Sequence, residues 1–111
     1  MVGRNEAGEI VPVDSTFVCI SAAGPRRDLD KGAREQPYWD AHERFVDRLV
    51  EAGFIVMGGP LPDEGGALII VRAPSEADVR ETLRDDPWYV HGVLELVDVK
   101  RWEVYVDRWR T

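Results

Sequence analysis

Hydrophobic side chains recur with helical spacing between Pro37 and Ala52. At about 100° per residue, the apolar and charged positions separate onto opposite faces, which predicts an amphipathic helix. The apolar face comprises Tyr38, Ala41, Phe45, Val46, Leu49 and Ala52. His42 falls near the middle of this face, so its ring should point inward, where its nitrogens need partners. The imidazole is therefore either a structural group bonded within the fold or a proton carrier in a pocket.

Runs of β-branched, aromatic and aliphatic residues predict four strands. The first covers residues 16–22. The second covers residues 54–57 and should stop at Gly58-Gly59-Pro60, from where a turn would lead into the third strand and close a hairpin. The third, residues 67–73, is the most apolar run and should lie in the centre of the sheet.

Residues 93–106 predict a last long strand, or a strand followed by an extension, with two apolar faces. Alternation places Leu94, Leu96, Trp102, Val104 and Val106 on one face, and Val93, Val97, Val99 and Tyr105 on the other. Both faces of this strand should therefore be covered.

A second helix is predicted to start after Ser75, which is a favourable N-cap, and to end before Pro87. Residues 86–92 should form a turn or a single helical turn. Residues 24–36 are polar, with two glycines and a proline, and indicate a long loop.

The predicted order is strand, helix, strand, strand, helix, strand, which is the ferredoxin-like βαββαβ arrangement of the α+β class. Four antiparallel strands would carry two helices on one face. The other face is also apolar, and the chain offers no third layer to cover it. A second copy is the simplest cover, so a homodimer through the sheets is predicted.

Length and composition indicate one domain over residues 15–106, with a loose arm at 1–14 and a tail at 107–111. A net charge of −7 argues against nucleic acid and anionic membranes as partners, because both require a cationic surface. The first residues lack the apolar core of a secretory signal, and no apolar run is long enough to span a membrane. The single cysteine, Cys19, lies in an apolar run, which indicates a buried thiol and a cytoplasmic setting.

Asp86 is the best candidate partner for His42. The two predicted helices should pack side by side, so a residue at the end of the second can approach the first. A carboxylate beside an imidazole fixes its tautomer and raises its basicity. The competing interpretation is that Asp86-Pro87 only ends a helix.

Gly58, Gly59 and Pro60 form a second candidate element. Glycines admit a ligand close to the backbone and expose N–H groups that can stabilise an oxyanion, although a tight turn explains the same residues. Trp88 could form the wall of an aromatic pocket.

Other features carry less information. Arg26, Arg27, Lys31 and Arg34 gather in the long loop, where they could attract an anionic substrate or simply be solvated. His91 could be a second pocket histidine, although a surface or capping role is favoured. The two histidines lack the ligand spacing of a metal site, so neither a metal nor another cofactor is expected.

Three motifs in order resemble the YCII-related (YciI-like) family of small α+β proteins. They are the helix YWDAHERFVDRLVEAG, the strand end GGPLPD and the segment DPWYVHGVLELVDVKRW, within residues 15–105. The resemblance implies a dimeric α+β barrel with a His–Asp active site, and it assigns the histidine to His42 and the aspartate to Asp86. Some members resemble lyases that process aromatic breakdown products. The loop at 24–36, the N-terminal arm and the segment Trp102–Trp109 depart from the family's pattern, which affects pocket shape and substrate more than fold.

The leading hypothesis is a small cytoplasmic enzyme, a lyase or isomerase that transfers protons without a cofactor. His42 would be the general acid or base, Asp86 its orienting partner, and the Gly58–Gly59 backbone a stabiliser of negative charge. One alternative is a dimer that binds a small ligand without catalysis. Another is a structural dimer with a filled barrel, in which His42 bonds to a backbone carbonyl.

Overall fold

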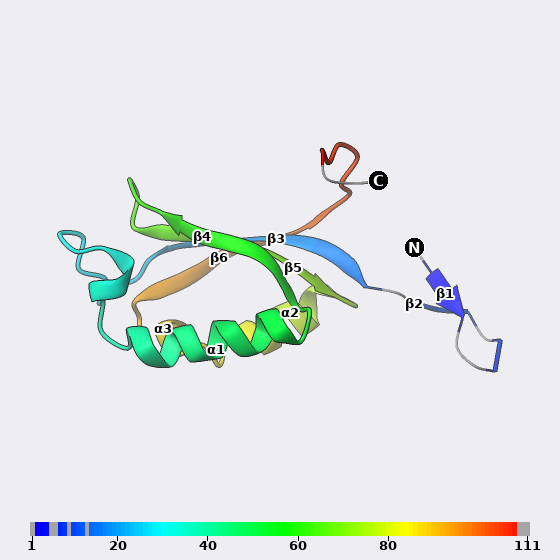
Figure 1. Cartoon of the computed structure of the whole chain (residues 1–111), viewed down its shortest axis with the longest axis horizontal. Helices are drawn as coiled ribbons and strands as arrows, with labels where there is room; N and C mark the ends of the chain where they lie inside the picture. Colours follow the sequence, from blue (N-terminus) through cyan, green and yellow to red (C-terminus); the bar gives the residue numbers. More distant parts are fainter. Residues whose placement is uncertain (1, 5–6, 9, 13, 109–111) are drawn as a thin grey trace.

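The computed structural model of this chain contains a four-stranded antiparallel sheet, and the helices pack on one face of this sheet (Figure 1). The structure describes residues 2–4, 7–8, 10–12 and 14–108. The strands are β3 (Ser15–Ala23), β4 (Ile55–Leu61), β5 (Gly66–Ala73) and β6 (Leu94–Trp102), in the order β4-β5-β3-β6. The helices are α1 (Trp39–Glu51), α2 (Glu76–Leu83) and the short α3 (Pro87–Val90). This arrangement confirms the predicted α+β, ferredoxin-like fold.

The helices begin and end largely where the sequence indicates. Ser75 caps α2 by accepting a hydrogen bond from the backbone N–H of Asp78. Gly53 follows α1 with a φ of +80°, a conformation that glycine adopts at little cost. At the start of α1, Tyr38 takes the left-handed conformation, with a φ of 64°, so Pro37 precedes the first helical turn. A 3₁₀ turn, η1 (Ala33–Glu35), interrupts the long loop before α1.

The main core lies between the sheet and the helices. It contains Phe17, Cys19, Ile55, Val71, Ala73, Val79, Leu83 and Val99. A second cluster of Trp88, Val93 and Leu94 lies beside α3. By contrast, α1 has no fully buried residue. Of its predicted apolar face, the four residues within the helix are half-buried, whereas Tyr38 and Ala52 flank the helix and are exposed. The reason that no residue of α1 is fully buried is a cavity beneath this helix, described below.

Strand β4 corrects the prediction that the chain leaves the sheet at Gly58-Gly59-Pro60. The strand continues to Leu61, with Gly58 opposite Ile69 and Pro60 opposite Ala67. A proline is tolerated here because β4 is an edge strand, where alternate N–H groups have no partner strand. The predicted hairpin with a central β5 is confirmed.

Strand β6 contains an irregularity that alternation could not predict. Ile20 of β3 pairs with Asp98, but the next residue, Ser21, pairs with Leu96, so Val97 is left over as a bulge. The bulge reverses the alternation: Val97 is 55% exposed and Val99 only 6%. The prediction that these two valines share a face is therefore wrong. The strand ends at Trp102, and residues 103–106 follow it without strand structure, in line with the predicted alternative of a strand and an extension.

Residues 2–4 and 10–12 form two short strands, β1 (Val2–Arg4) and β2 (Ile10–Pro12), which pair antiparallel. The sequence predicted a loose arm here, because runs of three residues between glycines and charged residues carry no strand signal. Trp109 and the other last residues of the predicted tail lie outside the described residues. Within the described ranges, no helix has the length and apolar character needed to cross a membrane.

Candidate active site

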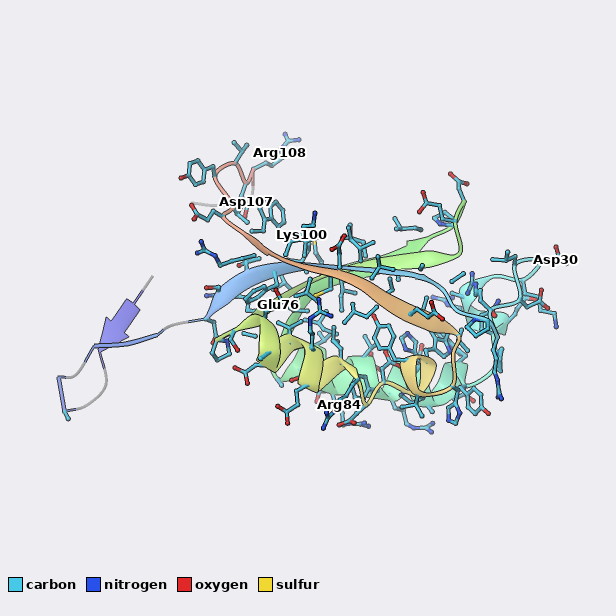
Figure 2. The ribbon with its side chains drawn as sticks, turned by 180° about the vertical axis from the view of Figure 1, so that it is seen from behind. Asp30, Glu76, Arg84, Lys100, Asp107 and Arg108 are labelled. Carbon is cyan, nitrogen blue, oxygen red and sulfur yellow. The ribbon has the colours of Figure 1, made fainter. Side chains whose placement is uncertain are left out.

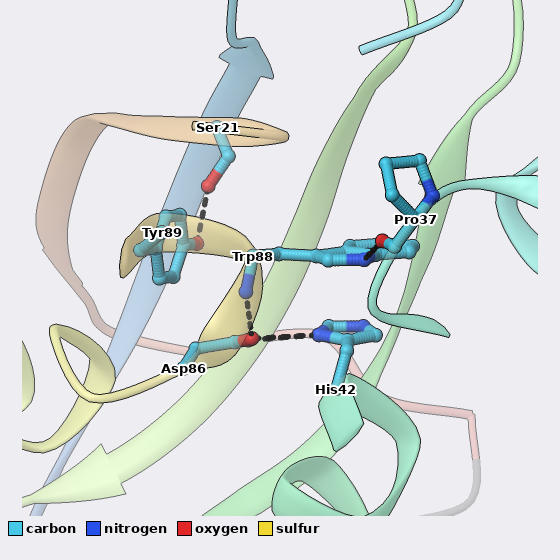
Figure 3. A network of polar contacts seen from close by, with 6 residues as sticks. All are labelled: Ser21, Pro37, His42, Asp86, Trp88 and Tyr89. Atoms are coloured by element: carbon cyan, nitrogen blue, oxygen red, sulfur yellow. Dashed lines mark hydrogen bonds and ion pairs between the residues drawn. The ribbon is translucent and has the colours of Figure 1, made fainter. Parts of the chain in front are cut away.

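The side chains of His42 and Asp86 meet at one end of the fold. Nδ1 of His42 lies 2.8 Å from Oδ1 and 2.9 Å from Oδ2 of Asp86, although 44 residues separate them in sequence (Figure 3). Both side chains are largely buried, with 14% and 5% of their surfaces exposed. A carboxylate can only accept here, so the ring nitrogen carries the hydrogen and donates it.

Asp86 is held in place by its own backbone neighbourhood. It is the N-cap of α3, and its Oδ1 accepts a hydrogen bond of 2.9 Å from the backbone N–H of Trp88. Pro87 occupies the first turn of α3, where its missing N–H is not needed. The carboxylate of Asp86 is therefore oriented by its own capping hydrogen bond to α3, a helix of one turn.

Trp88 fixes the plane of the imidazole. Its ring is stacked on that of His42, with centroids 3.7 Å apart and an angle of 6° between the planes. Its indole N–H donates to the carbonyl oxygen of Pro37 at 2.9 Å (Figure 3). The ring of Trp39 is tilted against both of these rings, and its centroid lies 5.7 Å from that of His42 and 5.6 Å from that of Trp88. The imidazole is thus oriented by a hydrogen bond in its plane and by a stacked ring across it.

A cavity of about 540 Å³ opens beside these rings, between α1 and strands β4 and β5. Most of its wall is apolar and includes Trp39, Phe45, Val46, Ile55, Ile69 and Leu94. The residues to which the sequence assigned a catalytic or substrate-binding role all border it, namely His42, Gly58, Gly59, Pro60, Asp86 and Trp88. Its volume and apolar character are those of a pocket for a small organic molecule.

The two glycines of β4 differ in their surroundings. A Cβ on Gly58 would lie 2.4 Å from Cγ2 of Ile69, so this position is glycine because the neighbouring strand leaves no space. A Cβ on Gly59 would meet nothing within 4 Å. Since both residues lie within a strand, neither forms the tight turn that the sequence allowed.

Tyr89 and Ser21 form a second polar contact beside the cavity, which sequence reasoning missed. The hydroxyl of Tyr89, a lining residue, is hydrogen-bonded to that of Ser21 (Figure 3). Burial raises the pKa of Tyr89 to about 12, while the hydrogen bond to Ser21 opposes this effect. Tyr89 follows Trp88 directly in the sequence. The sequence feature that could have indicated its place beside the cavity is this pair of aromatic residues in α3.

Two further residues considered from the sequence, His91 and Cys19, do not border the cavity. His91 is stacked on Tyr38 at 3.9 Å and forms the C-cap of α3, in line with the favoured capping role. Cys19 is buried in the core, and this burial raises the pKa of its thiol to about 11, against an opposing effect of Arg80. Among the described residues, no group of three His, Cys, Asp or Glu side chains could hold a metal ion.

One nitrogen of this cavity-lining imidazole is without a hydrogen bond to the described residues. With Nδ1 bonded to Asp86, Nε2 of His42 has no hydrogen-bonding partner among the described residues. An imidazole in this tautomer has a lone pair on Nε2 that can accept a proton. The carboxylate can then stabilise the imidazolium that forms.

Comparison with known proteins identifies the family. A family model described as the YCII-related domain matches residues 16–103, so the chain belongs to this family. No curated protein matches it. A solved structure, 5-chloro-2-hydroxyhydroquinone dehydrochlorinase (TftG) from Burkholderia phenoliruptrix AC1100 in complex with 2,5-dihydroxybenzoquinone, is similar with a TM-score of 0.61. The two are 23% identical, and the alignment covers 79% of this chain and 93% of that chain, a likeness that shows the shared fold.

Proposed function

We propose that this chain is a small-molecule enzyme in which His42 transfers protons, in a reaction of the lyase or isomerase type without a cofactor. The observation that carries this proposal is the orientation of one ring. His42 has its Nδ1 bonded to Asp86 and its ring on the wall of an apolar cavity, where Nε2 is without a partner among the described residues. A purely structural histidine would have both nitrogens satisfied.

In this mechanism, Nε2 takes a proton from a C–H or O–H group of the substrate. The electron pair left behind moves into the conjugated system of the substrate. In a lyase reaction a leaving group then departs with its bonding electrons, and the imidazolium of His42 gives up its proton to the leaving group or to water. In an isomerase reaction His42 returns the proton to another atom of the substrate. Asp86 stabilises the imidazolium between the two steps, and general acid–base catalysis of this kind contributes about 10²- to 10⁴-fold in rate.

The apolar walls favour a flat, ring-shaped substrate. Trp39 and Phe45 border the cavity together with Trp88, which offers aromatic surface against which a ring can pack. Gly59 leaves open space above the backbone of β4, so a substrate can approach closely there. We assign substrate contacts to Gly58, Gly59, Pro60 and Trp88, with backbone N–H groups of the edge strand as stabilisers of negative charge.

We further propose that the enzyme works as a homodimer. The face of the sheet opposite the helices carries Val18 next to Ile70 and Ile20 next to Leu68, on the paired strands β3 and β5. Met57 and Trp102 add exposed apolar surface, while Lys100 also lies on this side (Figure 2). A contiguous apolar patch of this kind supports an interface between copies. The buried, unpaired Cys19 supports the cytoplasm as its location.

An elimination assay tests the proposed function. The substrate is 5-chloro-2-hydroxyhydroquinone, the compound in the name of the structurally similar dehydrochlorinase, and release of chloride is followed over time. We expect the unaltered protein to accelerate this release. His42→Gln should reduce the rate at least about 100-fold, because the amide cannot accept the proton.

His91→Gln is the matched control, since it makes the same change at a histidine that does not border the cavity. It should leave the rate unchanged. Equal rates for His42→Gln and the unaltered protein would contradict the role of His42. The absence of acceleration by any of the three proteins, with the compound still bound, would favour the alternative of a dimer that binds a ligand without catalysis.

A further inference from the structure

Arg27 is a charged residue of the cavity wall that the proposed proton transfer does not use. It follows β3, and its side chain borders the same cavity as His42. Its Nε atom is buried, and it has no hydrogen-bonding partner in the described part of the chain. No ion pair of Arg27 is present there either. The terminal nitrogens of Arg27 are not buried in this way and also have no hydrogen-bonding partner among the described residues, so they are the donors available to a partner from outside the chain.

The backbone around Arg27 is anchored to the segment that follows α3. Gly24 N–H donates to the carbonyl of Val93 at 2.9 Å, and Arg26 N–H donates to that of Gly92 at 2.9 Å. Gly24 cannot carry a side chain, because its Cβ would lie 2.2 Å from the carbonyl oxygen of Gly92. Arg27 N–H closes the turn on the carbonyl of Gly24 at 3.1 Å. The start of the long loop is thus held to the element that carries the active-site residues.

The side chain of Arg27 passes close to the turn between β4 and β5. A Cβ on Gly65, another residue of the cavity wall, would lie 3.6 Å from Nε of Arg27 and 2.7 Å from Cδ2 of Leu29. Gly65 also has a φ of +76°, which disfavours any side chain there. The missing side chain therefore makes room for Leu29, and the side chain of Arg27 lies directly beside Gly65 at this end of the cavity.

The charges of the cavity wall are unbalanced. Its cationic side chains are Arg27 and Arg34, and its carboxylate among the described residues is that of Asp86. Asp86 already accepts from His42 and from the backbone of Trp88, as described above. Two guanidinium groups consequently face an otherwise apolar cavity in a chain whose net charge is −7. This excess of positive charge favours an anionic occupant.

We propose that Arg27 binds a carboxylate of the substrate, so that small, flat carboxylic acids are preferred over rings without this group, such as the chlorinated hydroquinone of the assay above. This inference rests on the proposed function, since it describes the substrate of the same site. The two terminal nitrogens of a guanidinium present N–H groups in a planar fork that matches the two oxygens of a carboxylate. Arg34 lies at the exposed side of the cavity and adds attraction for the same group.

The test compares two probes of the same shape, 2,5-dihydroxybenzoate and the uncharged 2,5-dihydroxybenzamide, by isothermal titration calorimetry. The unaltered protein should bind the carboxylate more tightly than the amide. Arg27→Met should weaken binding of the carboxylate by about ten- to a hundredfold, the size of one lost charged contact, and leave the amide unchanged. Arg27→Lys keeps the positive charge but not the planar pair of N–H donors. Its affinity for the carboxylate should lie between those of the unaltered protein and Arg27→Met.

Arg26→Met is the matched control, because Arg26 is an exposed neighbour that does not border the cavity. It should bind both probes as the unaltered protein does, and melting curves establish that every variant is folded. Equal affinity for the two probes, unchanged carboxylate affinity in Arg27→Met, or no binding of the carboxylate at millimolar concentration would each overturn the inference. Failure of the proposed function has a different readout, namely full activity of His42→Gln in the elimination assay. The affinities for the two probes do not depend on that activity.

Discussion

The rings of His42 and Trp88 are stacked 3.7 Å apart in nearly parallel planes. The segment that provides this stacking ring also provides the carboxylate that binds Nδ1 of His42. Asp86 and Trp88 are joined by a capping hydrogen bond, so a helix of one turn positions the imidazole in two directions at once. Small changes in this segment should therefore affect both stability and chemistry.

Substitution of Asp86 should separate its capping role from its charge. Asp86→Ala removes the N-cap of α3 and the partner of His42, and we expect it to lower the free energy of unfolding by about 2–3 kcal/mol. Asp86→Asn should lower it less, because the amide oxygen can still accept from Trp88 N–H. Urea denaturation provides the measurement. Asp85→Ala is the control, since Asp85 is exposed. If Asp85→Ala lowered the free energy of unfolding as much as Asp86→Ala does, the capping and pairing roles assigned to Asp86 would be contradicted.

The adjacent glycines of β4 should lose different amounts of stability on the same substitution. Gly58→Ala places a Cβ 2.4 Å from Ile69 and 3.0 Å from the carbonyl oxygen of Leu68, so the strands must shift. We expect a loss of about 1–3 kcal/mol in the free energy of unfolding. Gly59→Ala should cost less than about 1 kcal/mol, because its Cβ meets nothing within 4 Å. Thermal or urea denaturation distinguishes them, and an equal loss in both variants would contradict the register of β4.

Tyr89 should make the protein less stable in alkaline solution. Its pKa is about 12 in the folded protein and about 10 in the unfolded chain, so between these pH values only the unfolded chain loses the proton. The contribution is fully present below pH 10 and is lost as the pH rises to about 12, a decrease of about 3 kcal/mol.

The comparison is with Tyr89→Phe, measured by urea denaturation over the same pH range. Cys19 adds a loss of the same sign, but both proteins retain this thiol, so the difference between them isolates Tyr89. We expect the stability of Tyr89→Phe to fall less steeply. Parallel pH profiles for the two proteins would show that the phenol is not buried as described.

Cys19 should be almost unreactive in the folded protein. Its side chain has no exposed surface, and its pKa of about 11 instead of 9 lowers the thiolate fraction at neutral pH about 100-fold. The reaction with a coloured disulfide reagent should therefore be slower than that of free cysteine by more than this factor, and should become complete in urea. Because this is the chain's single cysteine, the signal has one source. Rapid reaction without denaturant would contradict its burial.

The sequence predicted those parts of the fold that depend on local periodicity. The apolar face around His42 and the uninterrupted apolar run of β5 predicted a helix and a central strand, and both are present. The course of β4 through Pro60 and the bulge at Val97 were missed, because they depend on which residues of a neighbouring strand lie opposite. Such register shifts have no signal in a single strand's own alternation.

The site was predicted in part for a related reason. Packing of neighbouring helices suggested that Asp86 could approach His42, and the family resemblance assigned the pair. Tyr89 and Arg27 were not placed in the pocket, since their positions depend on α3 and on a loop anchored through backbone hydrogen bonds. The composition of the loop revealed a cluster of positive charge but not which of its residues faces the cavity.

The tautomer of His42 tests the central claim most directly. Long-range nitrogen–proton NMR spectra of the imidazole in alkaline buffer, where the ring is uncharged, distinguish a hydrogen on Nδ1 from one on Nε2. We expect the hydrogen on Nδ1 in the unaltered protein, and a shift toward Nε2 in Asp86→Asn, whose amide can donate to Nδ1. A hydrogen on Nε2 in the unaltered protein would contradict the account, because no lone pair would then face the cavity to accept a proton.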